Sequence, residues 1–222
     1  MLLHKKTAKE IAYDYIKDRI IKGEYKPNYK INDVEIAQEL GISKMPIREA
    51  IQVLVSQNFL TSTPKIGTTV TELNIKDVYQ IYEPLAVIQG LAARNACLLV
   101  NQRDVKVLKQ INNDLEEAIK DDDYLKAMNL DKEFHEYFLV IANNPYITNF
   151  CNELLMQIQR LESIFLSTFT SYQNSVEEHN LIIEALENKD EDKASKYMEN
   201  NWLTSIPNIN IRSLSRLVNA IK

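Results

Sequence analysis

The sequence predicts a mainly α-helical protein, in which a small N-terminal domain with one β-hairpin precedes an antiparallel, all-helical bundle. The chain has 222 residues but only 4 Gly and 6 Pro, which are the residues that interrupt helices. Three of the glycines lie in the first third, and helical periodicity is almost unbroken from Asp77 onward. We therefore expect one domain over residues 1–73 and a second over residues 74–222.

The composition is that of an ordinary globular chain, with 45% apolar and 26% charged residues. No apolar run approaches the roughly 20 residues of a membrane span, and the first residues lack the apolar core of a signal peptide. We expect a cytoplasmic protein with no membrane partner. Cys97 and Cys151 show no CxxC spacing, which favours buried free thiols over a disulfide or a zinc cluster.

Charge divides unevenly between the two predicted domains. Residues 1–73 carry 11 Lys and Arg against 9 Asp and Glu, whereas the remainder carries 15 against 22. The N-terminal domain is therefore free to bind nucleic acid, while the acidic remainder is repelled by it.

The first two helices of the N-terminal domain follow from apolar spacing and end signals. A helix over residues 5–22 ends at Gly23, and a loop follows it. Asn32 or Asp33 then caps a short helix, whose inward residues we expect to be Val34, Ala37 and Leu40.

The stretch from Gly41 to Ala50 holds closely spaced helix stop and start signals. Gly41 turns the chain, Ser43 supplies a cap, and Pro46 lies in the first turn of a helix over about 43–57. The spacing buries one face of this helix, formed by Ile47, Ala50, Ile51 and Leu54. It leaves another face to solvent, which carries Lys44, Met45, Arg48 and Gln52.

Residues 59–63 and 68–71 are rich in β-forming side chains and are joined by a turn over 64–67, so they predict a hairpin. Helix, helix, turn, helix and hairpin in this order form a winged helix-turn-helix. Its reading helix places side chains in a DNA major groove.

The bundle follows as a series of helices with short loops, which makes neighbours antiparallel. Pro84 should kink the first of them or mark a boundary. Residues 207–222 are either a tail or a short helix. The expected helices are about 77–100, 103–120, 122–142, 145–169, 172–187 and 190–206.

Two histidines and a carboxylate are predicted to face the bundle interior. Asp131 and His135 are four residues apart, on a face that also carries Phe134 and Phe138. His179 lies on the apolar face of a later helix. Because burying these groups unpaired is costly, we expect either a divalent metal or a hydrogen-bond network filled by water or a ligand.

At residues 26–31 and 36–51 the chain resembles the DNA-binding domain of GntR-family bacterial transcription regulators. Its later helices resemble the ligand-sensing FCD domain of the FadR branch, and the resemblance spans about residues 8–205. This resemblance implies a homodimer that reads double-stranded operator DNA.

The resemblance also carries over individual DNA contacts. Lys30, Lys44 and Arg48 match basic family positions, and Gly67 matches the glycine of the wing tip. Lys44 replaces a more usual arginine and Met45 a small hydroxyl residue, so we expect an altered base preference at that site. The full set of predicted DNA-contacting residues is Lys30, Ser43, Lys44, Met45, Arg48, Lys65, Gly67 and Thr68.

FCD domains commonly hold a metal through an aspartate and three histidines, which implies Asp131, His135 and His179 as ligands of zinc or nickel. The family's last histidine is replaced here by Asn201, so we expect weaker metal binding. An arginine and a glutamate that often recognise a carboxylate effector are replaced by Leu85 and Gln89. Either another group binds the anion, or the effector is less charged, or the pocket has lost its ligand.

The predicted function is a transcription repressor, controlled by a small molecule, a divalent metal or both in the helical domain. The effector pocket is expected to include Asn201, Leu85 and Gln89. One alternative is a metal-independent sensor of an acyl-CoA or lipid-like ligand with the same architecture. A metal-dependent hydrolase is the remote alternative. We predict no catalytic residue, because no general base stands beside the metal ligands, and therefore no enzyme.

Overall fold

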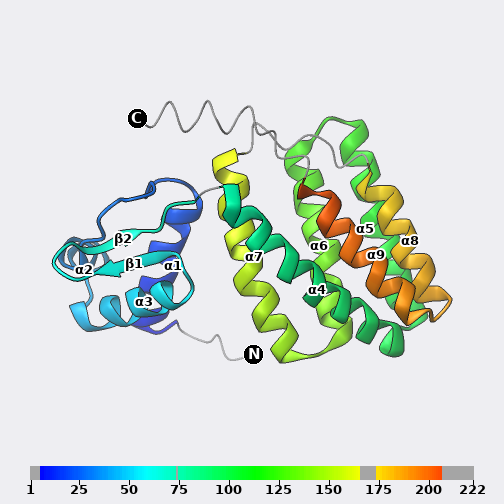
Figure 1. Ribbon diagram of the computed structural model, residues 1–222, viewed down its shortest axis with the longest axis horizontal. Coiled ribbons are helices and arrows are strands. Elements are labelled where there is room, and N and C mark those ends of the chain that lie inside the picture. The colour runs from blue at the N-terminus through cyan, green and yellow to red at the C-terminus, as the bar shows by residue number, and fades with distance from the viewer. Residues whose placement is uncertain (1–5, 74, 166–173, 207–222) are drawn as a thin grey trace. The chain divides into compact units, whose positions relative to one another are not determined.

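The computed structural model describes residues 6–73, 75–165 and 174–206, and this part of the chain is mainly helical (Figure 1). It divides into two compact units. The first comprises Met1–Asn74 with Gln159–Ile164, and the second comprises Ile75–Ile158 with Phe165–Lys222. The mainly helical fold with a small wing confirms the predicted fold class.

The N-terminal unit contains three helices, α1 (Ala8–Ile21), α2 (Asp33–Leu40) and α3 (Lys44–Ser56). Thr7 and Glu10 form a capping box at the start of α1, and the Asn32 side chain accepts the amide N–H groups of Val34 and Glu35 at the start of α2. α1 packs against α3. The buried side chains of this unit include Ala12, Ile16, Ile20, Ile47, Ala50, Leu54 and Phe59.

A two-stranded antiparallel sheet forms the wing, with β1 (Leu60–Thr63) paired to β2 (Gly67–Val70). Lys65 and Gly67 both have positive φ angles, of 68° and 104°, at the tip that joins the strands. Lys30 forms an isolated antiparallel bridge with Thr69, so the segment before α2 lies along the second strand.

Two local predictions in this unit are wrong. Val34 is 37% exposed, whereas Ile36 is 3% exposed and takes the inward position. The helix begins at Asp33, and this start turns Val34 outward while Ile36 and Ala37 face the core. Ser43 occupies the N-cap position of α3 with extended backbone angles, but its side chain makes no capping hydrogen bond.

The second unit is a helical bundle. α4 packs against α6 and α9, α5 packs against α6 and α8, and α8 packs against α9 (Figure 1). These contacts bring five helices around one interior, which holds Phe134, Phe138 and Met198. The helices from Ile75 onward are α4 (Ile75–Leu99), α5 (Gln102–Lys120), α6 (Tyr124–Ala142), α7 (Pro145–Phe165), α8 (Ser175–Glu187) and α9 (Glu191–Thr204), and the segment Gln159–Ile164 of α7 is grouped with the first unit.

Pro84 does not mark a boundary, because α4 continues through it without a break. Tyr82, Leu85 and Ala86 on either side of the proline are buried, so packing of this face offsets the one hydrogen bond that proline removes. Six residues later, Gly90 allows α4 to lie close to α9: a Cβ there would stand 2.6 Å from Glu199 Cγ.

Both cysteines, Cys97 and Cys151, are free and buried. No helix among the described residues has the length and apolar character needed to span a membrane. The predicted helical turns at 166–169 and 172–173, and the stretch 207–222, lie outside the described residues.

Candidate DNA interface and metal centre

The outward face of α3 carries the side chains predicted to meet DNA. Ser43, Lys44, Met45 and Arg48 are all exposed, and Met45 is 70% exposed. Arg48 Nε donates a hydrogen bond of 2.7 Å to Asp33 Oδ2 at the start of α2. Sequence reasoning treated Asp33 only as a helix cap. The sequence does contain a signal for this pair: the acidic Asp33 opens the helix that directly precedes the reading helix, which carries Arg48.

The wing brings together four further predicted residues. Ile31 N–H donates to Thr68 O over 2.9 Å, which fixes the neighbouring Lys30 alongside the hairpin. A Cβ added at Gly67 would stand 3.3 Å from Lys30 Cε, so the lysine side chain crosses the glycine at the wing tip. Lys65 is exposed in the same turn. The wing therefore presents two lysines close to the exposed backbone of Gly67.

Asp131 and His135 on α6 meet His179 on α8 in the bundle interior. Asp131 Oδ1 lies 3.6 Å from His179 Nε2, and Asp131 Oδ2 lies 3.9 Å from His135 Nε2. One ligand atom from each of the three residues lies within 4.8 Å of the others. The structure therefore brings together all three predicted metal ligands, from helices that are far apart in the sequence.

Asn112 on α5 fixes the protonation of His179. The Asn112 Nδ2 group donates to Val176 O and Asn180 Oδ1, both at 3.0 Å, so its Oδ1 is the atom that lies 3.0 Å from His179 Nδ1. This oxygen can only accept, and His179 Nδ1 must therefore carry the hydrogen. In the neutral ring, Nε2 then holds a lone pair that faces the Asp131 carboxylate.

Burial keeps both histidines neutral. It lowers the pKa of His135 from 6.5 to about 3, although a hydrogen bond with the Asn201 side chain acts in the opposite direction. Burial, followed by the proximity of His135, lowers the pKa of His179 well below its usual value. Aromatic rings enclose the pair: Phe134 stacks on His179 with ring centroids 3.7 Å apart, and Trp202 lies 4.5 Å from His135.

This donor set fits a divalent first-row metal. Imidazole nitrogens and a carboxylate are common ligands of such ions. Atoms bound to zinc at about 2.0–2.2 Å lie roughly 3–3.5 Å apart, and the observed separations of 3.6 and 3.9 Å require only small side-chain adjustments. His179 Nε2, the ligand atom that faces Asp131, has no hydrogen-bond partner among the described residues. Asn112 supplies the supporting hydrogen bond that metal-binding histidines usually make.

Sequence reasoning missed Asn112. It is 2% exposed and lies on the same buried face of α5 as Leu108, Ile111 and Leu115. A single asparagine within an apolar helical stripe is a detectable signal, because a buried amide needs partners.

The three predicted effector-pocket residues are all buried. Leu85 and Gln89 have 0% exposure on α4, and Asn201 has 3% exposure on α9. Neither amide atom of Gln89 has a hydrogen-bond partner in the described part of the chain. α4 packs against α6 and α9, the helices that carry His135 and Asn201.

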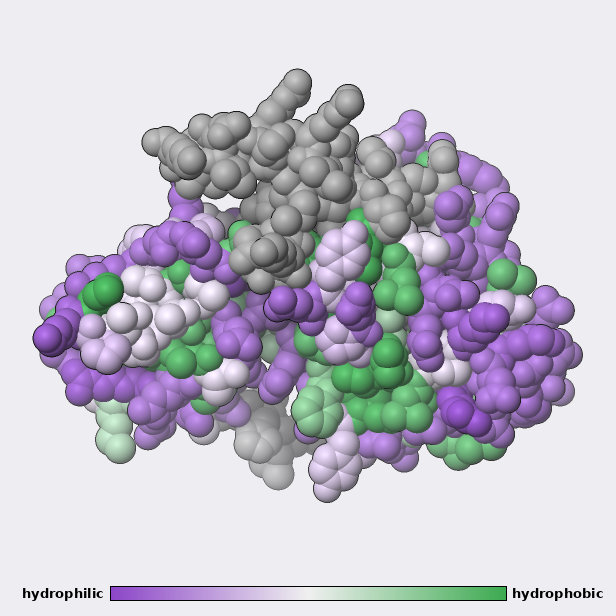
Figure 2. All heavy atoms as spheres, in the orientation of Figure 1, coloured by the Kyte–Doolittle hydropathy of each residue, from purple (hydrophilic) through white to green (hydrophobic). Residues whose placement is uncertain are grey.

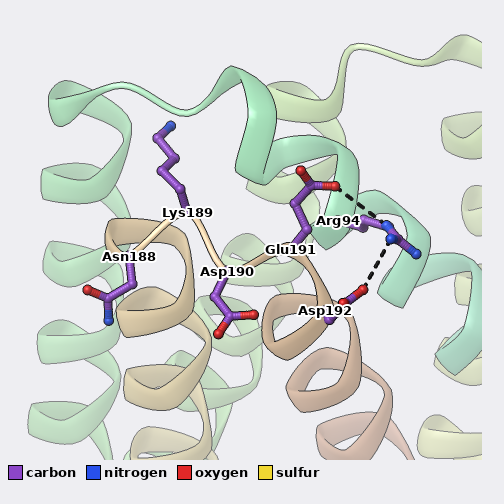
Figure 3. Close-up of a pocket in the computed structure, with 6 residues that line it drawn as sticks. All are labelled: Arg94, Asn188, Lys189, Asp190, Glu191 and Asp192. Atoms are coloured by element: carbon purple, nitrogen blue, oxygen red, sulfur yellow. Dashed lines mark ion pairs between the residues drawn. The ribbon is translucent and has the colours of Figure 1, made fainter.

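A separate surface pocket lies where α8 turns into α9, and its charged lining groups are already paired. Arg94 forms ion pairs with Glu191 at 3.6 Å and Asp192 at 3.1 Å (Figure 3). Lys189 Nζ donates to the carbonyls of Cys97 and Val100 at the end of α4. These contacts join helix ends, and we assign no ligand to this pocket.

Comparison with known proteins identifies both units. Residues 8–70 match the model described as "Bacterial regulatory proteins, gntR family", and residues 80–202 match the FCD domain. Among relatives, "Uncharacterized HTH-type transcriptional regulator YdhC" of Bacillus subtilis is 25% identical over 84% of this chain and 84% of its own length. The gluconate operon transcriptional repressor of Bacillus subtilis is 25% identical, with 83% of this chain and 77% of its own length covered.

Escherichia coli McbR/YncC has a similar solved structure, with a TM-score of 0.73, 19% identity, and 94% of this chain and 100% of that chain covered. This structural similarity shows that the chain shares the fold of McbR/YncC. The chain belongs to the GntR family of bacterial regulatory proteins, with a C-terminal FCD domain, and is a DNA-binding transcriptional regulator.

Proposed function

We propose that this regulator is a repressor whose operator binding is modulated by a divalent metal held by Asp131, His135 and His179. One observation carries the metal proposal. The lone pair of His179 Nε2 and the Asp131 carboxylate face each other at 3.6 Å, and both are hydrogen-bond acceptors. A divalent cation between these two atoms would be attracted by both of them. The two histidines, which burial keeps neutral, leave their ring lone pairs available to such an ion.

A small-molecule effector is the second part of this proposal. The described polar groups between α4, α6, α8 and α9 include the amides of Gln89 and Asn201, the two neutral histidines, and the carboxylates of Asp131 and Glu178. Gln89 can both donate and accept through its unpartnered amide. These groups favour an uncharged polar effector, or one whose anionic group binds the metal itself.

We propose a homodimer formed through the helical domain. Val87, Leu91 and Leu98 are 60%, 46% and 65% exposed and share one face of α4 by their spacing. Figure 2 shows apolar side chains gathered over α4 on this face of the bundle. Exposed apolar patches of this kind mark protein interfaces. Leu91→Asp should shift the mass measured by sedimentation toward that of a monomer, whereas a mass of one chain for the wild type would refute the dimer.

A DNA-binding titration with and without metal tests the proposed function. The operator is first selected from random-sequence DNA by the wild-type protein. Fluorescence anisotropy then measures its affinity for protein purified without chelator, for protein treated with EDTA, and for protein resupplied with Zn²⁺, Ni²⁺ or Mn²⁺. We expect the metal content to be about one ion per chain, and the operator affinity to differ between the metal-loaded and metal-free forms.

His135→Ala should abolish metal binding and the metal-dependent change in operator affinity. Glu133→Ala, at an exposed position of the same helix, should preserve both and is the matched control. A protein that binds its operator equally well at every metal concentration would refute the regulatory proposal. Binding of an acyl-CoA by metal-free protein, with no metal response, would favour the lipid-sensing alternative.

A further inference from the structure

Asn201 on α9 and Glu178 on α8 form a hydrogen bond beside the histidine pair. Asn201 Nδ2 donates to Glu178 Oε2 over 2.7 Å, and the asparagine is 3% exposed. Thr204 Oγ1 lies 3.1 and 3.2 Å from the two oxygens of the same carboxyl group. The Glu178 carboxylate is therefore held by two residues of α9 that lie three positions apart, on adjacent turns of the helix.

This bond determines which way the Asn201 amide points. A carboxylate only accepts hydrogen bonds, so the amide must turn its NH₂ group toward Glu178 and its oxygen to the opposite side. The hydrogen bond between Asn201 and His135 raises the pKa of His135 against the effect of burial, as expected for an oxygen that accepts from the ring. Asn201 Oδ1 therefore faces the cluster of Asp131, His135 and His179.

We propose that Asn201 Oδ1 is a fourth protein ligand of the metal, and that Glu178 is the positioning residue that turns this oxygen toward the ion. This inference rests on the proposed metal site. When the metal binds, the hydrogen of the neutral His135 ring would move from Nε2 to Nδ1, so that Nε2 and Asn201 Oδ1 both become ligands. The donor set is then two imidazole nitrogens and two oxygens.

The donor set has a consequence for metal preference. Imidazole suits Ni²⁺ and Zn²⁺, whereas carboxylate and carbonyl oxygens suit Mn²⁺. An amide oxygen in place of a third imidazole therefore weakens binding of Ni²⁺ and Zn²⁺ more than binding of Mn²⁺. The gap between nickel and manganese affinities in this protein should be narrower than in a site with three histidines.

Metal affinities of full-length Asn201 variants test the ligand assignment. Competition with a chromophoric chelator measures Ni²⁺, Zn²⁺ and Mn²⁺ binding to wild type, Asn201→His and Asn201→Ala. Asn201→His should raise the Ni²⁺ affinity about tenfold or more and the Mn²⁺ affinity much less. Asn201→Ala should lower the affinity for all three ions, and should change the visible absorption spectrum of bound Co²⁺. Unchanged affinities and an unchanged Co²⁺ spectrum in Asn201→Ala would overturn the assignment.

Variants of Glu178 test the positioning role separately. Glu178→Ala removes the acceptor that orients Asn201 and should lower metal affinity about tenfold, as losses of supporting hydrogen bonds do. Glu178→Gln keeps an oxygen acceptor for Asn201 Nδ2 and should restore most of that affinity. Glu177→Ala, at the exposed neighbouring position, is the matched control for loss of one negative charge.

Equal losses in Glu178→Gln and Glu178→Ala would show that charge, and not orientation, is responsible, and would overturn the positioning role. Different results would refute the proposed metal site itself. If the wild-type protein binds none of the ions, or if His179→Ala binds them as tightly as wild type, the site itself is refuted. If the wild type binds metal and only the Asn201 variants behave like wild type, the three-residue site stands and the fourth ligand is refuted.

Discussion

Arg48 Nε and Asp33 Oδ2 lie 2.7 Å apart, which links the reading helix α3 to the first turn of α2. The arginine side chain is 68% exposed and the aspartate side chain 25% exposed. A pair this exposed contributes little to folding stability. Its effect is on the orientation of the guanidinium, because the bond uses Nε and leaves the two terminal amino groups to donate to a guanine or a phosphate.

Loss of this pair should reduce the discrimination between DNA sequences. Asp33→Ala removes the acceptor of this bond and frees the Arg48 side chain, so the ratio of affinities for the selected operator and for scrambled DNA should fall. Glu35→Gln removes the same charge from the same turn of α2, at an exposed position, and should leave that ratio unchanged. Arg48→Ala should weaken operator binding by about 1–3 kcal/mol if the side chain reads a base. A uniform loss over all sequences would instead assign Arg48 to a phosphate.

The wing tip should be sensitive to a single methyl group. Gly67 has a φ of 104°, and a Cβ there would stand 3.3 Å from Lys30 Cε. Gly67→Ala should therefore destabilise the domain by about 1 kcal/mol or more, displace Lys30, and weaken DNA binding with a smaller salt dependence. The measurements are thermal unfolding and anisotropy at several salt concentrations.

Gly23→Ala is the control for backbone strain alone. Gly23 has a φ of 72°, but no atom lies within 4 Å of an added Cβ. This variant should lose similar stability and retain the DNA affinity. Equal losses of affinity in the two alanine variants would show that strain, and not the contact with Lys30, is responsible.

The bond between Asn112 and His179 should control metal affinity. Asn112→Leu removes the acceptor that holds the hydrogen on His179 Nδ1, so metal affinity should fall about 10- to 100-fold. Asn180→Ala removes only a partner of the Asn112 NH₂ group and should have a much smaller effect. Isothermal titration calorimetry measures the Zn²⁺ affinity of both variants. Equal affinities for Asn112→Leu and wild type would show that metal binding does not depend on Asn112 holding the hydrogen on His179 Nδ1.

Metal-free protein should lose stability below neutral pH. His135 titrates near 6.5 when unfolded but has its pKa lowered to about 3 by burial in the folded chain. Unfolding therefore takes up protons below pH 6.5, and stability is fully present above that pH. It falls with decreasing pH by about 1.4 kcal/mol per unit for each such histidine. Urea unfolding in EDTA between about pH 7.5 and about pH 5, a range that spans the unfolded-state pKa of 6.5, gives the slope of stability against pH.

His135→Gln should reduce that slope, because one buried neutral histidine no longer takes up a proton on unfolding. His179 provides the remaining dependence, since its pKa is also lowered by burial. Identical slopes for the variant and the wild type would contradict the proposed titration.

Helix positions followed from the sequence because they depend on local spacing and end signals. The cap at Asn32, the turn at Gly41 and the hairpin about residues 64–67 each act within a few residues. The wrong predictions concern residues at which local sequence signals competed with packing or with the position of a helix start. Of the two effects expected of Pro84, a boundary is absent because the buried face around the proline keeps α4 continuous. Val34 fits an apolar stripe, but the helix start turns it outward.

The sequence by itself determined that Asp131, His135 and His179 face inward, because helical periodicity assigns each residue a face. Only the tertiary structure decided which groups meet them. Asn112 reaches His179, and Glu178 turns Asn201, through contacts between different helices. These partners are fixed by how α5, α6, α8 and α9 pack, and spacing along one helix contains no information about the rotation or height of another.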